Sequence, residues 1–149
     1  MLARTLLVLV AGSLFAFDAT KDDAVKKDLQ SLQGDWVLVS MERDGEKAPE
    51  ESVKTFKRKI TDNKYTVDWE GEDGARTFSG VMTLDPTKNP KTVDVLVTSE
   101  GPAKDKTMLG IYKIEGDTHT VCVAGVDGER PTAFDSKLGS LNVWKRAKK

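Results

Sequence analysis

Leu29-Gln-Ser-Leu-Gln-Gly-Asp-Trp-Val-Leu-Val-Ser40 is the stretch of the chain that decides the fold. It begins with the end of a short amphipathic pattern, which Gly34 is suited to terminate, and continues with Trp36 at the start of a β-strand pattern. A glycine two positions before a tryptophan on the first strand of an all-β chain indicates a closed antiparallel barrel with an indole plugging one end. Such barrels either hold one small ligand or fill their interior with side chains, so this stretch predicts a scaffold without naming a ligand.

Outward from this stretch, the chain shows one helical pattern and eight strand patterns. Apolar residues at Val25, Leu29 and Leu32 predict a helix from Asp23 to Gln33. Period-two alternation, as in Phe56, Arg58 and Ile60, is typical of half-buried strands. The strands predicted in this way are Trp36–Met41, Phe56–Thr61, Lys64–Trp69, Arg76–Leu84, Thr92–Thr98, Met108–Ile114, Thr118–Ala124 and Leu141–Arg146.

Short turns join most of these strands. The turn pairs supply the positive φ angles that tight hairpins require, and they are Asp44-Gly45, Asp62-Asn63, Asp73-Gly74, Gly116-Asp117 and Asp127-Gly128. Because no long crossover connection interrupts the order, the prediction is an all-β fold, an antiparallel barrel of about eight strands with a short N-terminal helix. A two-sheet sandwich of the same strands is the main alternative.

The N-terminus carries the pattern of a secretory signal peptide. Arg4 precedes the apolar run from Leu6 to Phe17, and small residues follow it. The run is too short for a transmembrane helix, which needs about 20 apolar residues. We therefore expect a signal peptide at residues 1–19 and a single β-barrel domain at residues 20–149, secreted or periplasmic, with no stable membrane anchor after cleavage. An uncleaved, membrane-bound N-terminus is the alternative.

The charge balance and the single cysteine argue against nucleic acid as a partner and against disulfide bonds as a source of stability. The 23 basic and 24 acidic residues leave a net charge of −1, and their signs alternate locally. Nucleic acid is not expected as a partner, because phosphate binding needs a surplus of Lys and Arg. Cys122 is the only cysteine, so the domain has no intramolecular disulfide and its stability must come from packing.

Several blocks together carry a family resemblance, namely Leu32–Trp36, Leu84–Lys91, Leu109–Asp117, Glu129–Phe134 and a closing strand that ends in Trp144–Arg146. With these blocks, which span the chain from about Asp28 onward, the sequence resembles the small secreted lipocalin-like domain found in many paralogues in planctomycete bacteria. That resemblance implies a lipocalin-like barrel and no established biochemical activity. More distantly, the Gly-x-Trp of Gly34 and Trp36 is similar to that of lipocalins, which implies that a basic side chain from the last strand covers the indole. Arg146 matches that position, Lys145 is second, and Arg130 is a further candidate if its loop folds back across this end.

No catalytic constellation stands out, and no cofactor or metal is expected. His119 is the only histidine, and it lies three residues before Cys122 in one predicted strand, so the two point to opposite faces and cannot form a dyad. We expect His119 to be an exposed strand residue and Cys122 to be a small buried hydrophobe. A lone histidine leaves no usual zinc site, and no Gly-x-Ser-x-Gly occurs. A carboxylate pair remains open, but nothing in the sequence selects one.

Binding is therefore the expected function. The bulky residues that could line a cavity are Tyr65, Trp69, Phe78, Met82, Tyr112 and Trp144, and their alternative role is plain core packing. Arg130, next to the rigid Pro131, could belong to a loop that gates a ligand or could fix the barrel end to backbone carbonyls. Three hypotheses follow: a binding module for a small apolar or amphipathic molecule, a filled barrel that contacts an envelope protein, and a carboxylate-dependent hydrolase or isomerase.

Overall fold

The computed structural model describes residues 16–149. Most of the predicted signal peptide, residues 1–19, therefore lies outside the described residues. One long helix, α1 (Ala16–Leu32), leads into the first strand. It begins seven residues earlier than the sequence pattern predicted, because no proline or glycine between residues 16 and 22 interrupts the helical backbone.

The rest of the described chain is almost entirely β-structure, and each of the eight predicted strands is present. The elements after α1 are β1 (Gly34–Arg43), β2 (Glu46–Lys47), the one-turn helix α2 (Glu50–Val53), β3 (Lys57–Thr61), β4 (Lys64–Gly71), β5 (Gly74–Asp85), β6 (Lys91–Val97), β7 (Thr107–Glu115), β8 (Thr118–Ala124) and β9 (Gly139–Arg146).

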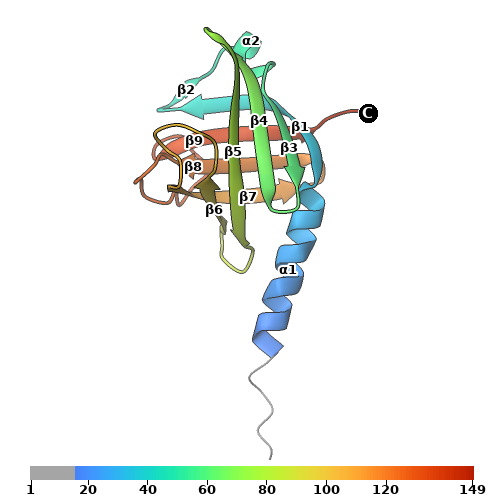
Figure 1. Ribbon diagram of the computed structural model, residues 1–149. Coiled ribbons are helices and arrows are strands. Elements are labelled where there is room, and N and C mark those ends of the chain that lie inside the picture. The colour runs from blue at the N-terminus through green and yellow to red at the C-terminus, as the bar shows by residue number, and fades with distance from the viewer. Residues whose placement is uncertain (1–15) are drawn as a thin grey trace, which may run out of the picture.

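These strands form a closed antiparallel barrel rather than a sandwich. Each strand from β3 to β9 pairs with its neighbour in sequence, and β1 pairs with both β3 and β9. The eight long strands thus close into one continuous sheet. The two-residue β2 only pairs, antiparallel, with the last two residues of β1. Figure 1 shows the closed sheet, with α1 projecting from one end.

A bulge in β1 shapes the barrel. The register of β1 against β9 shifts between Leu38 and Ser40, and Val39 at the bulge is 44% exposed. A bulge bends a strand and increases its twist. Before it, β1 pairs with both neighbours, whereas beyond it β1 pairs with β9 and β2. Helix α2 contacts β1 in this region and buries Val53.

Four of the predicted turn pairs connect neighbouring strands. Asp44, Asp62, Gly74 and Gly116 have positive φ in the hairpins after β1, β3, β4 and β7. The fifth pair behaves differently: Asp127 also has positive φ, but it lies within the long connection from Ala124 to Gly139 rather than in a tight hairpin. That connection folds over the outside of the barrel.

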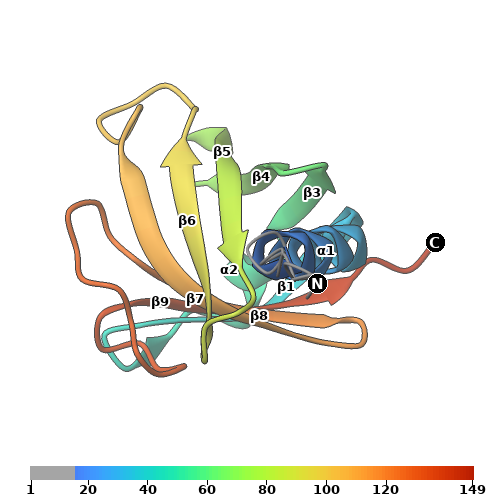
Figure 2. The ribbon, with the colours of Figure 1, turned by 90° about the horizontal axis from the view of Figure 1, so that it is seen from below.

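The two ends of the barrel differ. We call the end where α1, the start of β1 and the end of β9 meet the closed end, and the opposite end the mouth. Leu32, in the last turn of α1, is fully buried at the closed end. Figure 2 shows α1 end-on at this end of the barrel. The mouth lies where Arg43 of β1 pairs with Ser140 of β9.

Candidate functional site

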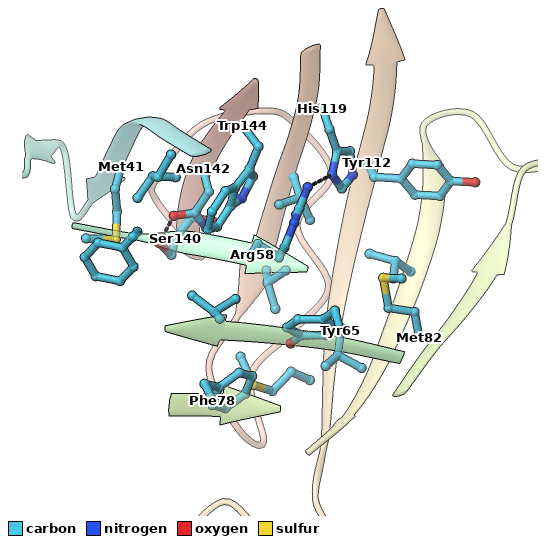
Figure 3. Close-up of a pocket in the computed structure, with 18 of the residues that line it drawn as sticks. Met41, Arg58, Tyr65, Phe78, Met82, Tyr112, His119, Ser140, Asn142 and Trp144 are labelled. Carbon is cyan, nitrogen blue, oxygen red and sulfur yellow. Dashed lines mark hydrogen bonds between the residues drawn. The ribbon is translucent and has the colours of Figure 1, made fainter. Parts of the chain in front are cut away.

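The barrel encloses a cavity of about 390 Å³. Side chains from α1 and from every strand except β2 form its wall, and most of them are apolar (Figure 3). The residues that line it are Leu32, Leu38, Met41, Arg43, Phe56, Arg58, Tyr65, Val67, Trp69, Phe78, Met82, Leu84, Val93, Val95, Met108, Tyr112, His119, Val121, Val123, Ser140, Asn142 and Trp144. Ligand cavities in proteins commonly fall between about 300 and 1,000 Å³, so this one can hold a small molecule.

The structure brings the predicted cavity residues together. Tyr65, Trp69, Phe78, Met82 and Tyr112 all line the cavity, as does Trp144. Their aromatic rings meet across neighbouring strands: the rings of Tyr65 and Phe78 lie 6.0 Å apart. Trp69 instead stacks on Phe56, with 5.4 Å between ring centroids and 2° between planes. A stacked pair of partly buried rings in the wall offers a flat apolar surface to a ligand.

The closed end is built around Trp36, which is 1% exposed. Its indole Nε1 donates a 2.8 Å hydrogen bond to the carbonyl oxygen of Leu32 in the last turn of α1. Arg146 pairs with Trp36 across β1 and β9, and its guanidinium carbon lies 4.4 Å from the centre of the indole. Of the three basic candidates for this position, Arg146 is the one that covers the ring.

Arg146 also holds the end of α1. Its guanidinium donates to the carbonyl oxygens of Ser31 at 2.6 Å and Gln33 at 2.8 Å. The last carbonyls of a helix have no partner within the helix, so this side chain satisfies that of Ser31 together with that of Gln33, the residue after the helix, and places a positive charge at the negative end of the helix dipole. Gly34 turns the chain between the helix and the strand with a φ of +103°, a conformation that favours glycine.

A buried carboxylate fastens α1 to the barrel wall. Asp28 Oδ2 accepts hydrogen bonds from the Tyr112 hydroxyl at 2.7 Å and from Lys91 Nζ at 2.8 Å. Burial, and then the hydrogen bond to this carboxylate, raise the pKa of Tyr112 above its ordinary value. Tyr112 therefore remains protonated, and its hydroxyl is turned toward Asp28 while its ring contributes to the cavity wall.

The main surprise is Arg58, a cation inside the barrel. Arg58 is 6% exposed, and its guanidinium carbon lies 4.4 Å from the ring centre of Trp144 and 5.4 Å from that of Trp36. No hydrogen-bond acceptor reaches its Nε, and no aspartate or glutamate is among the cavity-lining residues that the structure describes. Burial lowers the pKa of the guanidinium to about 9, which still leaves it charged at neutral pH. The signal was present in the sequence, because Arg58 alternates in phase with Phe56 and Ile60.

His119 is the partner of Arg58, and the expectation that it is exposed is wrong. It is 3% exposed, and its Nδ1 lies 2.8 Å from Arg58 Nη2 (Figure 3). Since a guanidinium can only donate, we assign Nδ1 as the acceptor and place the imidazole proton on Nε2. Burial, and then the charge of Arg58, lower the pKa of His119 well below its usual value, so the ring is neutral. Its phase with Val121 and Val123, both of which line the cavity, was the available signal.

Cys122 and Arg130 lie outside the cavity. Cys122 is fully buried, as predicted, and its thiol donates to the carbonyl oxygen of Asp135 in the connection before β9, away from His119. Arg130, in the same connection, donates to the carbonyl oxygen of Gly110 at 2.8 Å and pairs with Asp94 at 2.6 Å. Arg130 therefore ties this connection to β6 and β7. It neither covers the indole of the closed end nor lines the cavity.

Within residues 16–149, no three His, Cys, Asp or Glu side chains gather closely enough to hold a metal ion. The same part of the chain contains no helix with the length and apolar character needed to cross a bilayer.

A solved structure shares this architecture. A lipocalin-like protein from Bacteroides uniformis superposes with a TM-score of 0.51 over 78% of this chain and 99% of its own, at 12% sequence identity. The fold is lipocalin-like. An uncharacterized protein from Bacteroides eggerthii matches at a TM-score of 0.47 and 11% identity, over 77% of this chain and 98% of its own. No protein-family model and no curated protein matches the sequence. At these identities the likeness concerns the fold, and the function has to be argued from the site.

Proposed function

We propose that the protein is an exported lipocalin-like binding module for a small apolar or amphipathic molecule and that it catalyses no reaction. The observation that carries the proposal is the cavity of about 390 Å³, whose wall is mostly apolar and aromatic. Burying an apolar molecule there would remove its surface from water, which is the main driving force for such binding. Export rests on the signal-peptide pattern at residues 1–19, and the resemblance to the secreted planctomycete domain points in the same direction.

The two other hypotheses have less support. A filled barrel that acts only through its outer surface would leave no room inside, whereas this barrel encloses a ligand-sized space. A hydrolase or isomerase that relies on carboxylates needs two of them in one cleft. In the part of the chain that the structure describes, the cavity wall contains neither aspartate nor glutamate.

Binding can be tested with N-phenyl-1-naphthylamine, a neutral apolar dye that fluoresces when it leaves water. We expect a saturable increase in fluorescence with the natural protein. Val121→Trp places a large ring on the cavity wall and should abolish the increase. Leu96→Trp adds the same ring on the outer face of β6, where Leu96 is 41% exposed, and should leave the increase intact. No saturable signal, or equal signals from both variants, would count against a carrier.

Native mass spectrometry of the protein purified from its own host would then identify the bound molecule. A mass that is present under native conditions and lost on denaturation would support the carrier and show its ligand class. Bare protein that also fails to bind the dye would favour the filled-barrel alternative.

A further inference from the structure

The cavity contains one feature that an apolar ligand alone would not require, which is the cation near its closed end. Arg58 enters from β3 and meets His119 of β8, and its guanidinium carbon lies 4.4 Å from the Trp144 ring centre. A neutral imidazole and an indole face cannot neutralise a positive charge. Buried charges in proteins are normally paired, and the guanidinium forms no ion pair with any carboxylate of the described residues.

We infer that Arg58 is the head-group site for a single carboxylate, carried by an apolar body that fills the rest of the cavity. The inference rests on the proposed binding function and deepens it by naming the ligand class. A carboxylate would provide the missing counter-charge, and its oxygens are the acceptors to which a guanidinium donates most strongly. The Nε hydrogen of Arg58, buried without an acceptor, is one donor that such a ligand would satisfy.

One negative charge fits better than two. The other basic residue on the cavity wall is Arg43, which is exposed at the mouth and lies at the far end of β1 from Trp36. A doubly charged phosphate near Arg58 would therefore bury one uncompensated charge, which is strongly unfavourable in an apolar environment. His119 cannot offset it, because its proton-free Nδ1 already faces Arg58.

The volume limits the size of the ligand. A water-sized group occupies about 30 Å³ in a liquid, so 390 Å³ has room for about 13 non-hydrogen atoms. Decanoate, with twelve such atoms, is a matched probe. With the carboxylate near Arg58, its alkyl chain would lie against the apolar side chains of the same cavity, which include the stacked rings of Phe56 and Trp69.

The test compares ligands that share a chain and differ only in the head group. Calorimetric titration with decanoate, decan-1-ol and decylamine measures the contribution of the charge directly. We expect the natural protein to bind decanoate at least tenfold more tightly than decanol, and decylamine most weakly. Equal affinities for the acid and the alcohol would overturn the head-group site while leaving the carrier function in place. Failure of all three to bind would overturn both.

Two matched variants locate the head group. Arg58→Met keeps an unbranched side chain, shorter than that of arginine, and removes the guanidinium and its charge, so it should reduce the acid-to-alcohol ratio to about one. Arg43→Gln removes the arginine at the mouth of the same cavity and should leave the ratio unchanged. Loss of the preference in Arg43→Gln, or its survival in Arg58→Met, would place the carboxylate elsewhere and refute the inference.

A further measurement does not depend on whether the variants fold. Decanoate labelled with ¹³C at its carboxyl carbon reports its own ionisation when bound to the natural protein. Next to Arg58 the bound carboxylate should remain ionised at a lower pH than the free acid does. A bound carboxyl group that titrates at the same pH as the free acid, or at a higher pH, would show that it does not lie against the guanidinium.

Discussion

The burial of His119 makes the stability of this protein depend on pH in a narrow range. His119 is the only histidine in the chain, so apart from the N-terminal amine no other group with an ordinary pKa titrates between about pH 6 and pH 7.5. In the folded protein its pKa lies well below 6.5, because burial and then Arg58 disfavour the imidazolium. In the unfolded chain the ring should titrate near its ordinary pKa.

The sign and size of the effect follow from proton linkage. Between the folded and the unfolded pKa the unfolded chain binds more protons, so the free energy of unfolding rises with pH and falls as the solution is acidified below about pH 6.5. Between these two pKa values, the slope of the free energy of unfolding against pH approaches about 1.4 kcal/mol per pH unit. From pH 7.5 to pH 5.0 a histidine that stays neutral in the fold therefore removes about 2 kcal/mol of stability.

Urea unfolding at a series of pH values measures this, with His119→Gln as the matched control. Glutamine cannot titrate, but its amide oxygen can still accept a hydrogen bond from Arg58. Both proteins have the same carboxylates, so the difference between the two curves isolates the histidine. We expect that difference to change by about 2 kcal/mol over this range. A constant difference, or an imidazole proton resonance that titrates near pH 6.5 in the native protein, would refute the reasoning.

Three further predictions concern the closed end, the close contact of Gly110 with strand β8, and the buried thiol. Arg146→Ala removes the hydrogen bonds to the carbonyls of Ser31 and Gln33 at the end of α1 and the contact with Trp36, and should lower the free energy of unfolding by about 2–3 kcal/mol in urea. A loss below about 0.5 kcal/mol would contradict the capping role. Gly110→Ala would bring a Cβ within 2.7 Å of a backbone oxygen of β8 and should cost about 2–3 kcal/mol, whereas Gly125→Ala meets nothing and should be neutral in the same assay. Burial raises the pKa of the Cys122 thiol, so a thiol reagent at pH 8 should modify it only as fast as the protein unfolds; rapid labelling of the native protein would show that the connection over β8 opens.

The strands and their faces could be predicted because alternation is a local property of the sequence. Side chains in a strand point alternately to two faces, so Val93, Val95 and Val97 had to share one face wherever the strand lay. The turn pairs then fixed which strands are neighbours. The closed end was also within reach, because Trp36 and Arg146 lie near opposite ends of the chain yet belong to the first and last strands of a barrel that must meet to close.

Arg58 and His119 show where local patterns fail. Each lies in phase with cavity-facing apolar residues, yet from the sequence His119 is expected to be exposed and Arg58 is not singled out. A polar residue within an alternating strand pattern is ordinarily predicted to face solvent, because burying a polar group without a hydrogen-bond partner is unfavourable in free energy. The partner of each is the other, 61 residues away in sequence, and no local pattern encodes that meeting.

The sequence by itself determined the strands, the order in which they pair and the indole plug, because these depend on backbone conformation and on residues that are close in sequence or register. Only the tertiary structure decided that the interior holds a space of about 390 Å³ and that a cation lies within it. The physical reason is that a cavity is the volume left after all eight strands have closed. The size and charge of the cavity depend on side chains that come together from all of the strands, so they cannot be inferred from any single segment of the sequence.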